Sequence, residues 1–572
     1  MQKLNRNGIT FSFQWKELDI ETLINERVQV LEREKYFDRL RQKDVTLWSS
    51  DEAMFEDISK RLDWFEAPET SRPILSIAEK LKNELLSAGF KKAIILGMGG
   101  SSLAPEVYGQ FIKNLYENQN EGLNISILDS TDPEQIQLID QQVELEKTIF
   151  IVSSKSGTTA EVNSFFKYFW EKVNNAKISN PGKHFIAISD PETPLINLGI
   201  ARGFKKVITA NPNVGGRFSA LIEFGLIPAV LCGFDGEILL DNANFYSIYN
   251  TDQADKENLG FQLGIILAET YARGKDKLSI LTDQSNASFG GWIEQLVAES
   301  TGKAGESLLP IAQEPVFDDI NCYSEDRVFI NLSSEKKYDQ LLNDLQASNH
   351  PIINFPLKDV QNLCAYFYIW EVAVAVFCSL IGINAFDQPN VQLSKEITRE
   401  MLERIKSKNP ILSEEPILSN DWCDIYVTPR IKANVKEIKT IIKEFFNKIR
   451  SGDFIAINAF LPMTETNLSN FSKIRKQLTK KYKTPTTLGF GPRFLHSTGQ
   501  LHKGGKNNGH FLVITREKSL DLPIPHEGIT FGALQNAQAI GDVRALEKMS
   551  RHVMWIHLKQ KNIDELVSIF KK

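Results

Sequence analysis

From about residue 71 onward, short apolar runs alternate with longer segments in which apolar residues recur at helical spacing. Runs of this kind are typical of buried strands, and strands that alternate with helices form a parallel sheet covered by helices on both faces. The pattern therefore predicts an α/β fold. The first set of predicted strands is KKAIILG (91–97), LNISILD (123–129), KTIFIVSS (147–154), KHFIAIS (183–189) and KKVITA (205–210).

The same alternation of apolar runs and helical segments recurs later in the chain and predicts further domains. A second set of strands, KLSILTD (277–283), RVFINL (327–332) and HPIINFPL (350–357), precedes an apolar helix at 365–383 that we interpret as a core helix, not a membrane span. A proline- and serine-containing linker is predicted at 407–422, followed by strands DFIAINAFL (453–461), HFLVI (510–514) and HVMWIHL (552–558). We predict a helical N-terminal arm (1–70), two tandem α/β domains (71–245 and 246–410) and a C-terminal α/β domain (411–572).

Composition narrows the classes of function. The 66 basic and 72 acidic residues give a net charge of −6, too little positive charge to indicate binding to nucleic acid or an anionic membrane. The five cysteines are scattered without a Cys-x-x-Cys pair, which indicates neither a disulfide framework nor a zinc-thiolate site and fits a reducing cytoplasm. The N-terminus lacks the apolar run of a signal peptide.

Two loops rich in Gly, Ser and Thr follow predicted strands and precede predicted helices. The first is Gly97-Met98-Gly99-Gly100-Ser101-Ser102, and the second runs from Ser154 through Lys155, Ser156, Gly157 and Thr158 to Thr159. The N–H groups at a helix N-terminus bind anions, and the hydroxyls and the ammonium of the second loop add donors, so this loop predicts a phosphate cradle. The alternative is helix capping, although one hydroxyl would suffice for that. The first loop with Asp129 also resembles a dinucleotide fingerprint, but Ser102 stands where its last glycine belongs.

Four motifs in order resemble the glucose-6-phosphate isomerase family, whose sheets have the flavodoxin-like sugar isomerase fold. The motifs are the two loops together, Val214-Gly215-Gly216-Arg217-Phe218-Ser219, Gln295–Lys303 (QLVAESTGK) and Asp387–Lys395 (DQPNVQLSK). The C-terminal domain is similar to that of the isomerase halves of bacterial transaldolase–isomerase fusions. In the last motif Asn390 and Ser394 replace glycines of the family. This departure concerns the backbone geometry that the resemblance implies for this segment.

The resemblance implies a role for each matching residue. Glu299 would be the base that moves a proton between C2 and C1 of an opened sugar, and Arg217 would stabilise the charge of the enediolate intermediate. Lys395 and Gln388 would contact the oxygens of the open sugar, with Lys395 assisting ring opening. The substrate would be bound by Gly100, Ser101, Ser154, Lys155, Ser156, Thr159, Gln295 and Gln388. For Glu299 alone, an exposed helix end would be the simpler interpretation.

The histidine that opens the sugar ring is less directly indicated. In most family members it lies between the glutamate and the Gln/Lys segment and belongs to a neighbouring subunit, but here only His350 falls in that interval, outside any motif. The segment Leu495-His496-Ser497-Thr498-Gly499-Gln500 is similar to a histidine motif of some bacterial members. We therefore assign ring opening to His496, with His502 as the next candidate.

The predicted protein is a cytoplasmic glucose-6-phosphate isomerase, a monomer or homodimer that uses no metal and no cofactor. One alternative is a non-catalytic sugar-phosphate-binding regulator, which would be expected to lack the base, yet Glu299, Arg217 and Lys395 are all present. The other alternative is an NAD(P)-dependent oxidoreductase, in which the first loop would bind the dinucleotide.

Overall fold

The structure, a computed structural model, describes most of the chain and divides it into two compact units. The described residues are 2–17, 19–115, 122–250, 252, 254–407, 415–429, 437–559 and 563–571. The first unit comprises residues 1–129, 143–301 and 327–387, and the second comprises 130–142, 302–326 and 388–572. The predicted boundary at 410/411 lies outside the described residues, and the division into four domains stays a prediction.

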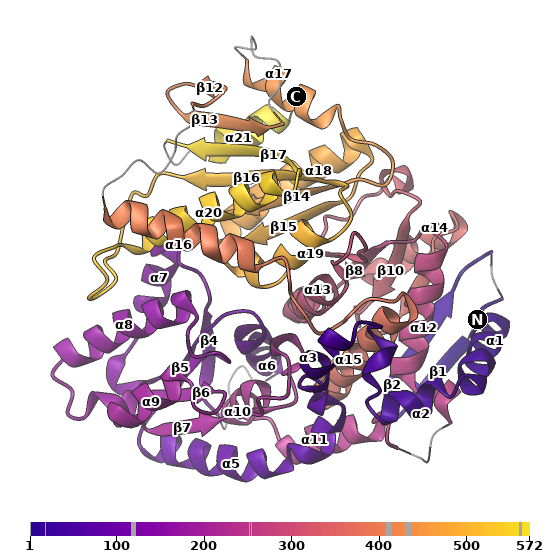
Figure 1. Ribbon diagram of the computed structural model, residues 1–572, viewed down its shortest axis with the longest axis horizontal. Helices are drawn as coiled ribbons and strands as arrows, with labels where there is room; N and C mark the ends of the chain where they lie inside the picture. The colour runs from indigo at the N-terminus through magenta and orange to yellow at the C-terminus, as the bar shows by residue number, and fades with distance from the viewer. Residues whose placement is uncertain are drawn as a thin grey trace. The chain divides into compact units, whose positions relative to one another are not determined.

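The first sheet of the first unit is fully parallel and flavodoxin-like (Figure 1). Its order across the sheet is β4 (Asn124–Leu128), β3 (Lys92–Gly97), β5 (Thr148–Ser153), β6 (Phe185–Ser189) and β7 (Lys206–Thr209). This is the order 2-1-3-4-5, and its switch point lies between β3 and β5, where ligands of such sheets bind. The helices of this part are α5 (Arg72–Ser87), α6 (Gly100–Leu115), α8 (Ala160–Asn175), α9 (Pro194–Ala201) and α10 (Glu223–Leu231).

The second sheet combines three parallel strands with an N-terminal hairpin. Within the first unit its order is β1 (Gln2–Arg6), β2 (Ile9–Gln14), β11 (Ile352–Asn354), β10 (Arg327–Asn331) and β8 (Lys277–Leu281), and β2 is antiparallel to β11. The predicted helical arm is therefore wrong for residues 2–14, although α1 (Ile20–Arg33) follows as a helix. The hairpin forms because Asn7 and Gly8 adopt positive φ values of 42° and 80°, while alternate residues of β2 are buried.

The apolar helix α15 (Leu363–Leu380) lies in the core of the first unit. It packs against α12 (Leu259–Ala272), α11 (Gly236–Phe245) and α13 (Ala287–Thr301). It meets the length and hydropathy of a membrane span, but most of it is buried inside the protein. Its interpretation as a core helix is confirmed. The first unit also contains the α-helices α2 (Tyr36–Arg41), α3 (Phe55–Ser59), α4 (Ala67–Thr70) and α14 (Asp339–Ala347).

The second unit is built on one mixed sheet. Its order is β12 (Leu418–Ser419), β13 (Cys423–Thr428), β17 (His552–Leu558), β16 (Gly509–Arg516), β14 (Phe454–Ala459) and β15 (Thr486–Phe490). The strands β17, β16, β14 and β15 are parallel, and β13 runs antiparallel to β17. The three predicted strands are confirmed, whereas β12 lies within the described end of the predicted linker. The unit also contains β9 (Leu309–Ala312).

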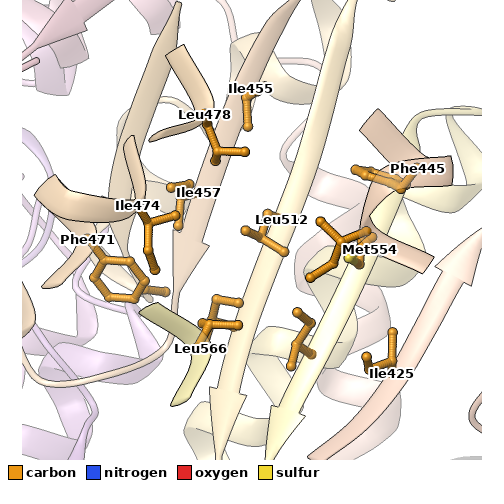
Figure 2. Close-up of a cluster of buried hydrophobic side chains, with 14 of the residues drawn as sticks. Ile425, Phe445, Ile455, Ile457, Phe471, Ile474, Leu478, Leu512, Met554 and Leu566 are labelled. Atoms are coloured by element: carbon orange, nitrogen blue, oxygen red, sulfur yellow. The ribbon is translucent and has the colours of Figure 1, made fainter. Parts of the chain in front are cut away.

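Helices α17 (Ile438–Phe446), α18 (Glu465–Tyr482) and α21 (Ile563–Phe570) bury the apolar residues of this sheet, and α20 (Phe531–Lys548) contacts β16 and β17. The unit also contains α7 (Pro133–Asp140), α16 (Gln392–Lys406) and α19 (Gly499–Gly504). Figure 2 shows the core, in which side chains of α18 meet those of the strands, including Phe471, Ile474, Leu478, Ile455, Ile457, Leu512 and Met554. The C-terminal segment of this unit begins at Gln388, ahead of the predicted boundary, and α16 within it packs closely on Gly541 of α20.

Candidate functional site

The two hydroxyl-rich loops follow β3 and β5 and flank the switch point of the first sheet. In the first loop α6 begins at Gly100, and the hydroxyl of Ser102 donates to the Asp129 carboxylate at 3.3 Å and to the Gly99 carbonyl at 3.1 Å. Asp129 thus accepts a hydrogen bond from the start of α6, and its side chain is buried. This arrangement does not favour Asp129 as a ligand of a ribose.

In the second loop the hydroxyls are not used as helix caps. Thr159 stands at the N-cap of α8 without a capping hydrogen bond from its side chain, and its Oγ1 lies 3.0 Å from Oγ of Ser154. Ser156 is exposed and accepts from the backbone N–H and the hydroxyl of Thr158 at 3.3 and 3.0 Å. Hydroxyls beside the N-terminal N–H groups of a 16-residue helix are suited to binding an anion. The geometry supports the cradle over the capping alternative.

Lys155 holds its ammonium group away from these hydroxyls. Its Nζ donates to the Asp190 carboxylate at 2.6 Å and to the Pro212 carbonyl at 3.0 Å. Burial lowers the pKa of Lys155 and raises that of Asp190, and the pairing of the two groups opposes both effects. A direct role of the Lys155 ammonium in phosphate binding stays a prediction.

Replacing Ser154, Ser156 and Thr159 together with Ala should weaken the binding of phosphorylated sugars and of inorganic phosphate alike, as measured by calorimetry. Each lost hydrogen bond to a charged group costs about 1.5–3 kcal/mol. Ser164→Ala is the matched control, because that hydroxyl lies on the same helix and donates to the Ala160 carbonyl. An unchanged affinity for phosphate in the triple variant would place the phosphate site elsewhere.

Arg217 is a buried cation held on several sides. Its side chain is 2% exposed, Nε donates to Ser300 Oγ at 2.8 Å, and Nη2 donates to the carbonyls of Ala385 and Asp387. Burial lowers the pKa of Arg217 and the nearby Glu299 carboxylate raises it, but a guanidinium stays charged in either case. The side chain is therefore a fixed positive charge. None of its partners was predicted from the sequence, although Ser300 stands next to Glu299 in a motif.

Glu299 lies beside this charge. Its Oε2 is 3.8 Å from Nη1 of Arg217 and accepts from the amide of Gln295 at 3.3 Å. Gln295 and Glu299 are four residues apart on α13, which places them on one helix face. Glu299 is only 7% exposed, so the interpretation as an exposed helix end is wrong. The structure thus brings together a buried carboxylate, an arginine and an amide, as proton transfer with charge stabilisation requires.

Gln388 and Lys395 belong to the second unit, where their segment contacts the predicted histidine loop. Gln500 of α19 accepts from the Asn390 backbone N–H at 3.0 Å and donates to the Asn390 side chain at 2.8 Å and to the Gly302 carbonyl at 2.9 Å. Asn390, which replaces a family glycine, is therefore held by the histidine loop of its own chain. Lys395 is exposed at the start of α16, and Gln388 is half-buried.

The histidine candidates differ in accessibility. His496 ends a short 3₁₀ turn and is partly exposed. His502 is buried between the rings of Phe494 and Phe511, and burial lowers its pKa well below the usual value, so it is a neutral core side chain and not a candidate for ring opening. His350 is buried in the first unit against Phe329. The structure leaves His496 as the accessible candidate among these three.

The histidine loop is anchored by an ion pair inside the second unit. Lys503 Nζ donates to Asp542 Oδ1 at 2.6 Å, and their side chains are 1% and 0% exposed. Asp542→Ala should lower the free energy of unfolding by about 3–5 kcal/mol, because it leaves a buried lysine charge unpaired. Denaturant titration measures the loss. Glu400→Ala, which removes an exposed partner of Arg404, should change it by at most about 1 kcal/mol, and equal losses in both variants would contradict this account.

Within the described ranges no group of three or more His, Cys, Asp or Glu side chains is arranged to hold a metal ion. The elements of the site are instead hydroxyls, helix N-terminal amides, one guanidinium and one carboxylate. A parallel sheet with two such loops at the ends of neighbouring strands is typical of α/β proteins that bind phosphorylated small molecules.

Comparison with known proteins shows similarity to sugar-phosphate isomerases over part of the chain. Residues 85–308 match the family model described as Phosphoglucose isomerase. The chain is 28% identical over 366 residues to the glucose-6-phosphate isomerase of Campylobacter jejuni, covering 54% of this chain and 85% of that protein. It is 27% identical over 402 residues to that of Carboxydothermus hydrogenoformans, covering 60% and 85%. This part of the chain is therefore similar to the phosphoglucose isomerase family. The segment with Gln388 and Lys395 lies beyond the residues that the family model matches.

Solved structures are similar in fold. A hypothetical protein from Thermus thermophilus superposes with a TM-score of 0.56 at 21% identity, covering 68% of this chain and 99% of that one. A glucose-6-phosphate isomerase from Chlamydia trachomatis gives a TM-score of 0.53 at 19% identity, covering 71% and 90%. These similarities confirm the α/β fold with parallel sheets.

Proposed function

We propose that this chain is a glucose-6-phosphate isomerase that interconverts glucose 6-phosphate and fructose 6-phosphate. The observation that carries the proposal is the buried Glu299 carboxylate 3.8 Å from the Arg217 guanidinium and hydrogen-bonded by Gln295, in the unit that also contains the Ser154–Thr159 loop. A base beside a fixed cation suits an aldose–ketose proton transfer, which needs neither a hydride acceptor nor a metal. The family match supports the same reaction.

The proposed mechanism assigns one step to each group. The Ser154–Thr159 loop binds the phosphate. His496 donates a proton to the ring oxygen as the bond from C1 to that oxygen breaks, while the C1 hydroxyl releases its proton to solvent, from which His496 is reprotonated. Glu299 then removes the proton from C2 of the open aldose, and Arg217 stabilises the enediolate. Glu299 returns the proton to C1 while a proton passes from the C2 hydroxyl to the oxygen on C1, which gives the ketose. Gln388, which follows Asp387 in the sequence, and Lys395 contact the sugar oxygens.

Two observations weigh against the alternatives. A non-catalytic regulator would not require the buried Glu299 beside Arg217, and an NAD(P)-dependent oxidoreductase would need Asp129, which accepts from Ser102 instead. The five cysteines are free and buried, which supports a cytoplasmic enzyme. We infer that one chain supplies every catalytic group, so that a monomer is active. A coupled assay with glucose 6-phosphate and mannose 6-phosphate tests the function, and absence of turnover of glucose 6-phosphate would refute it.

A further inference from the structure

A buried amide side chain joins the histidine loop to two other segments of the second unit. Gln500 lies on α19, four residues after His496, and its side chain is fully buried. Its Oε1 accepts from the backbone N–H of Asn390 at 3.0 Å, and its Nε2 donates to Asn390 Oδ1 at 2.8 Å and to the Gly302 carbonyl at 2.9 Å. The amide thus has a partner for its acceptor and for both of its N–H groups.

The backbone packs tightly around these hydrogen bonds. A Cβ at Gly504 would lie 2.4 Å from Asn390 Oδ1, 2.6 Å from the Gly302 carbonyl oxygen and 2.7 Å from Gln500 Nε2. These distances are shorter than van der Waals contacts, so the close approach requires glycine at the end of α19. The backbone N–H of Gly305 also donates to the Gly504 carbonyl at 3.0 Å. A shift of any one of the three segments would therefore displace the other two.

The histidine loop provides a fixed base for this contact. The Arg551 guanidinium, which is buried, donates through Nη2 to the carbonyls of Lys503 and Gly505 at 2.7 Å each. Lys503 is in turn paired with Asp542 of α20. Hydrogen bonds from charged donors are stronger than those between neutral groups. The Gln500 side chain thus extends from a backbone that two charged side chains hold in place.

The other end of the contact fixes the start of α16. Asn390 stands two residues before this helix begins at Gln392, and Lys395 lies on its first turn. Further along, a Cβ at Gly541 of α20 would lie 2.4 Å from Thr398 Oγ1, so α16 is also seated closely on α20. A helix is stiff over its length, and fixing its start and its middle therefore fixes the position of Lys395.

The two segments that Gln500 joins carry the groups assigned to ring opening. His496 would donate the proton to the ring oxygen, and Lys395 would assist. Such groups work only at a fixed separation, because small misplacements of catalytic groups cost a large part of the rate. An apolar side chain would fill position 500 at lower cost, since a buried amide needs partners for all of its polar atoms.

We propose that Gln500 is a positioning residue: by holding Asn390 it fixes the segment that carries Gln388 and Lys395 relative to His496. The inference rests on the proposed isomerase function for its catalytic consequence but not for its structural one. Half of the contact depends on the Asn390 side chain, which stands in place of a family glycine and accepts from Gln500 Nε2. The pairing is therefore specific to chains that have both residues.

The test compares Gln500→Met with Asn508→Leu in the full-length chain. Each substitution replaces an amide with an apolar side chain of similar shape, and Asn508 donates to the Gly452 carbonyl at 2.7 Å. That bond lies at the amino ends of β14 and β16, whereas the histidine loop follows the carboxyl end of the parallel strand β15. Both variants should unfold at a lower temperature than the wild type. Only Gln500→Met should lose at least about tenfold in kcat with glucose 6-phosphate.

A double-mutant cycle tests whether the loss passes through Asn390. Asn390→Ala removes the side-chain contact but keeps the bond from Gln500 to Gly302, so its loss of kcat should be smaller. The double variant should lose no more than Gln500→Met alone, because residues in contact do not contribute additively. Turnover of an open-chain substrate analogue should fall much less in each variant, since that analogue needs no ring opening. Additive losses, or equal losses with both substrates, would overturn the proposal.

Hydrogen exchange tests the structural consequence without any assay of activity. Peptides covering residues 388–395 should exchange faster in Gln500→Met and in Asn390→Ala but not in Asn508→Leu. If Gln500→Met does not fold, Asn390→Ala carries the same predictions with smaller effects. Unchanged exchange in both variants of the contact would overturn the proposal, and so would equal losses of kcat in Gln500→Met and Asn508→Leu. An inactive wild type whose variants show the expected exchange would instead refute the proposed function.

Discussion

Glu299→Gln is expected to lower kcat by at least about 10²-fold while leaving the binding of fructose 6-phosphate nearly unchanged. The substitution keeps the shape of the side chain but removes the proton acceptor, and general base catalysis is typically worth about 10²–10⁴-fold. Gln295 and Arg217 contact Oε2 with N–H groups, and the glutamine can still present its carbonyl oxygen to them. Steady-state kinetics with a coupled assay measures kcat, and calorimetry measures binding.

The matched control is Glu294→Gln, the same chemical change on the same helix. It should leave kcat close to the wild-type value. Near-normal turnover in Glu299→Gln would show that Glu299 is not the base. Loss of substrate binding together with loss of turnover would indicate that the substitution misplaces the substrate, and the loss of the proton acceptor would then not explain the result.

His496→Asn is expected to lower turnover of the cyclic sugar phosphate by about 10²-fold or more, because ring opening loses its proton donor. An open-chain substrate analogue does not require ring opening, so its turnover should fall much less. His526→Asn serves as the control, since His526 is exposed and its positive φ of 64° is tolerated by Asn. Equal losses with both substrates would exclude His496 from ring opening.

Sedimentation of the wild-type protein at assay concentrations tests whether one chain suffices. If His496 acts within its own chain, the active species should be a monomer. Activity that appears only with dimer formation would favour a histidine supplied by a partner subunit, as in most members of the family.

Strands such as β3, β5, β6 and β14 could be predicted because they are buried on both faces and therefore form apolar runs in the sequence, whereas the parallel strand β15 was not predicted. The N-terminal hairpin could have been found from Asn7-Gly8 and the alternation of Ile9, Phe11 and Phe13. The set of residues that make up the second unit could not be predicted from the sequence. It includes residues 130–142 through contacts such as that of Asp132 with Lys518 at 2.8 Å, and nothing local in the sequence indicates a pair 386 residues apart.

The candidate site likewise has features that could be predicted from the sequence and features that could not. The motifs singled out Glu299 and Arg217 because their residue types and family order are specific. The groups that hold Arg217 are mainly backbone carbonyls, which are present at every position and carry no sequence signal. The burial of His502 also depends on Phe494 and Phe511 packing around it, which the glycine-rich loop sequence does not reveal.

Incubation of the purified full-length protein with glucose 6-phosphate in D₂O, followed by NMR, tests the central claim most directly. The account predicts formation of fructose 6-phosphate without added nicotinamide, with deuterium appearing at the carbon to which Glu299 returns its proton. Both the conversion and the exchange should be lost together in Glu299→Gln. Absence of conversion by the wild type, or conversion that depends on an added nicotinamide cofactor, would contradict it.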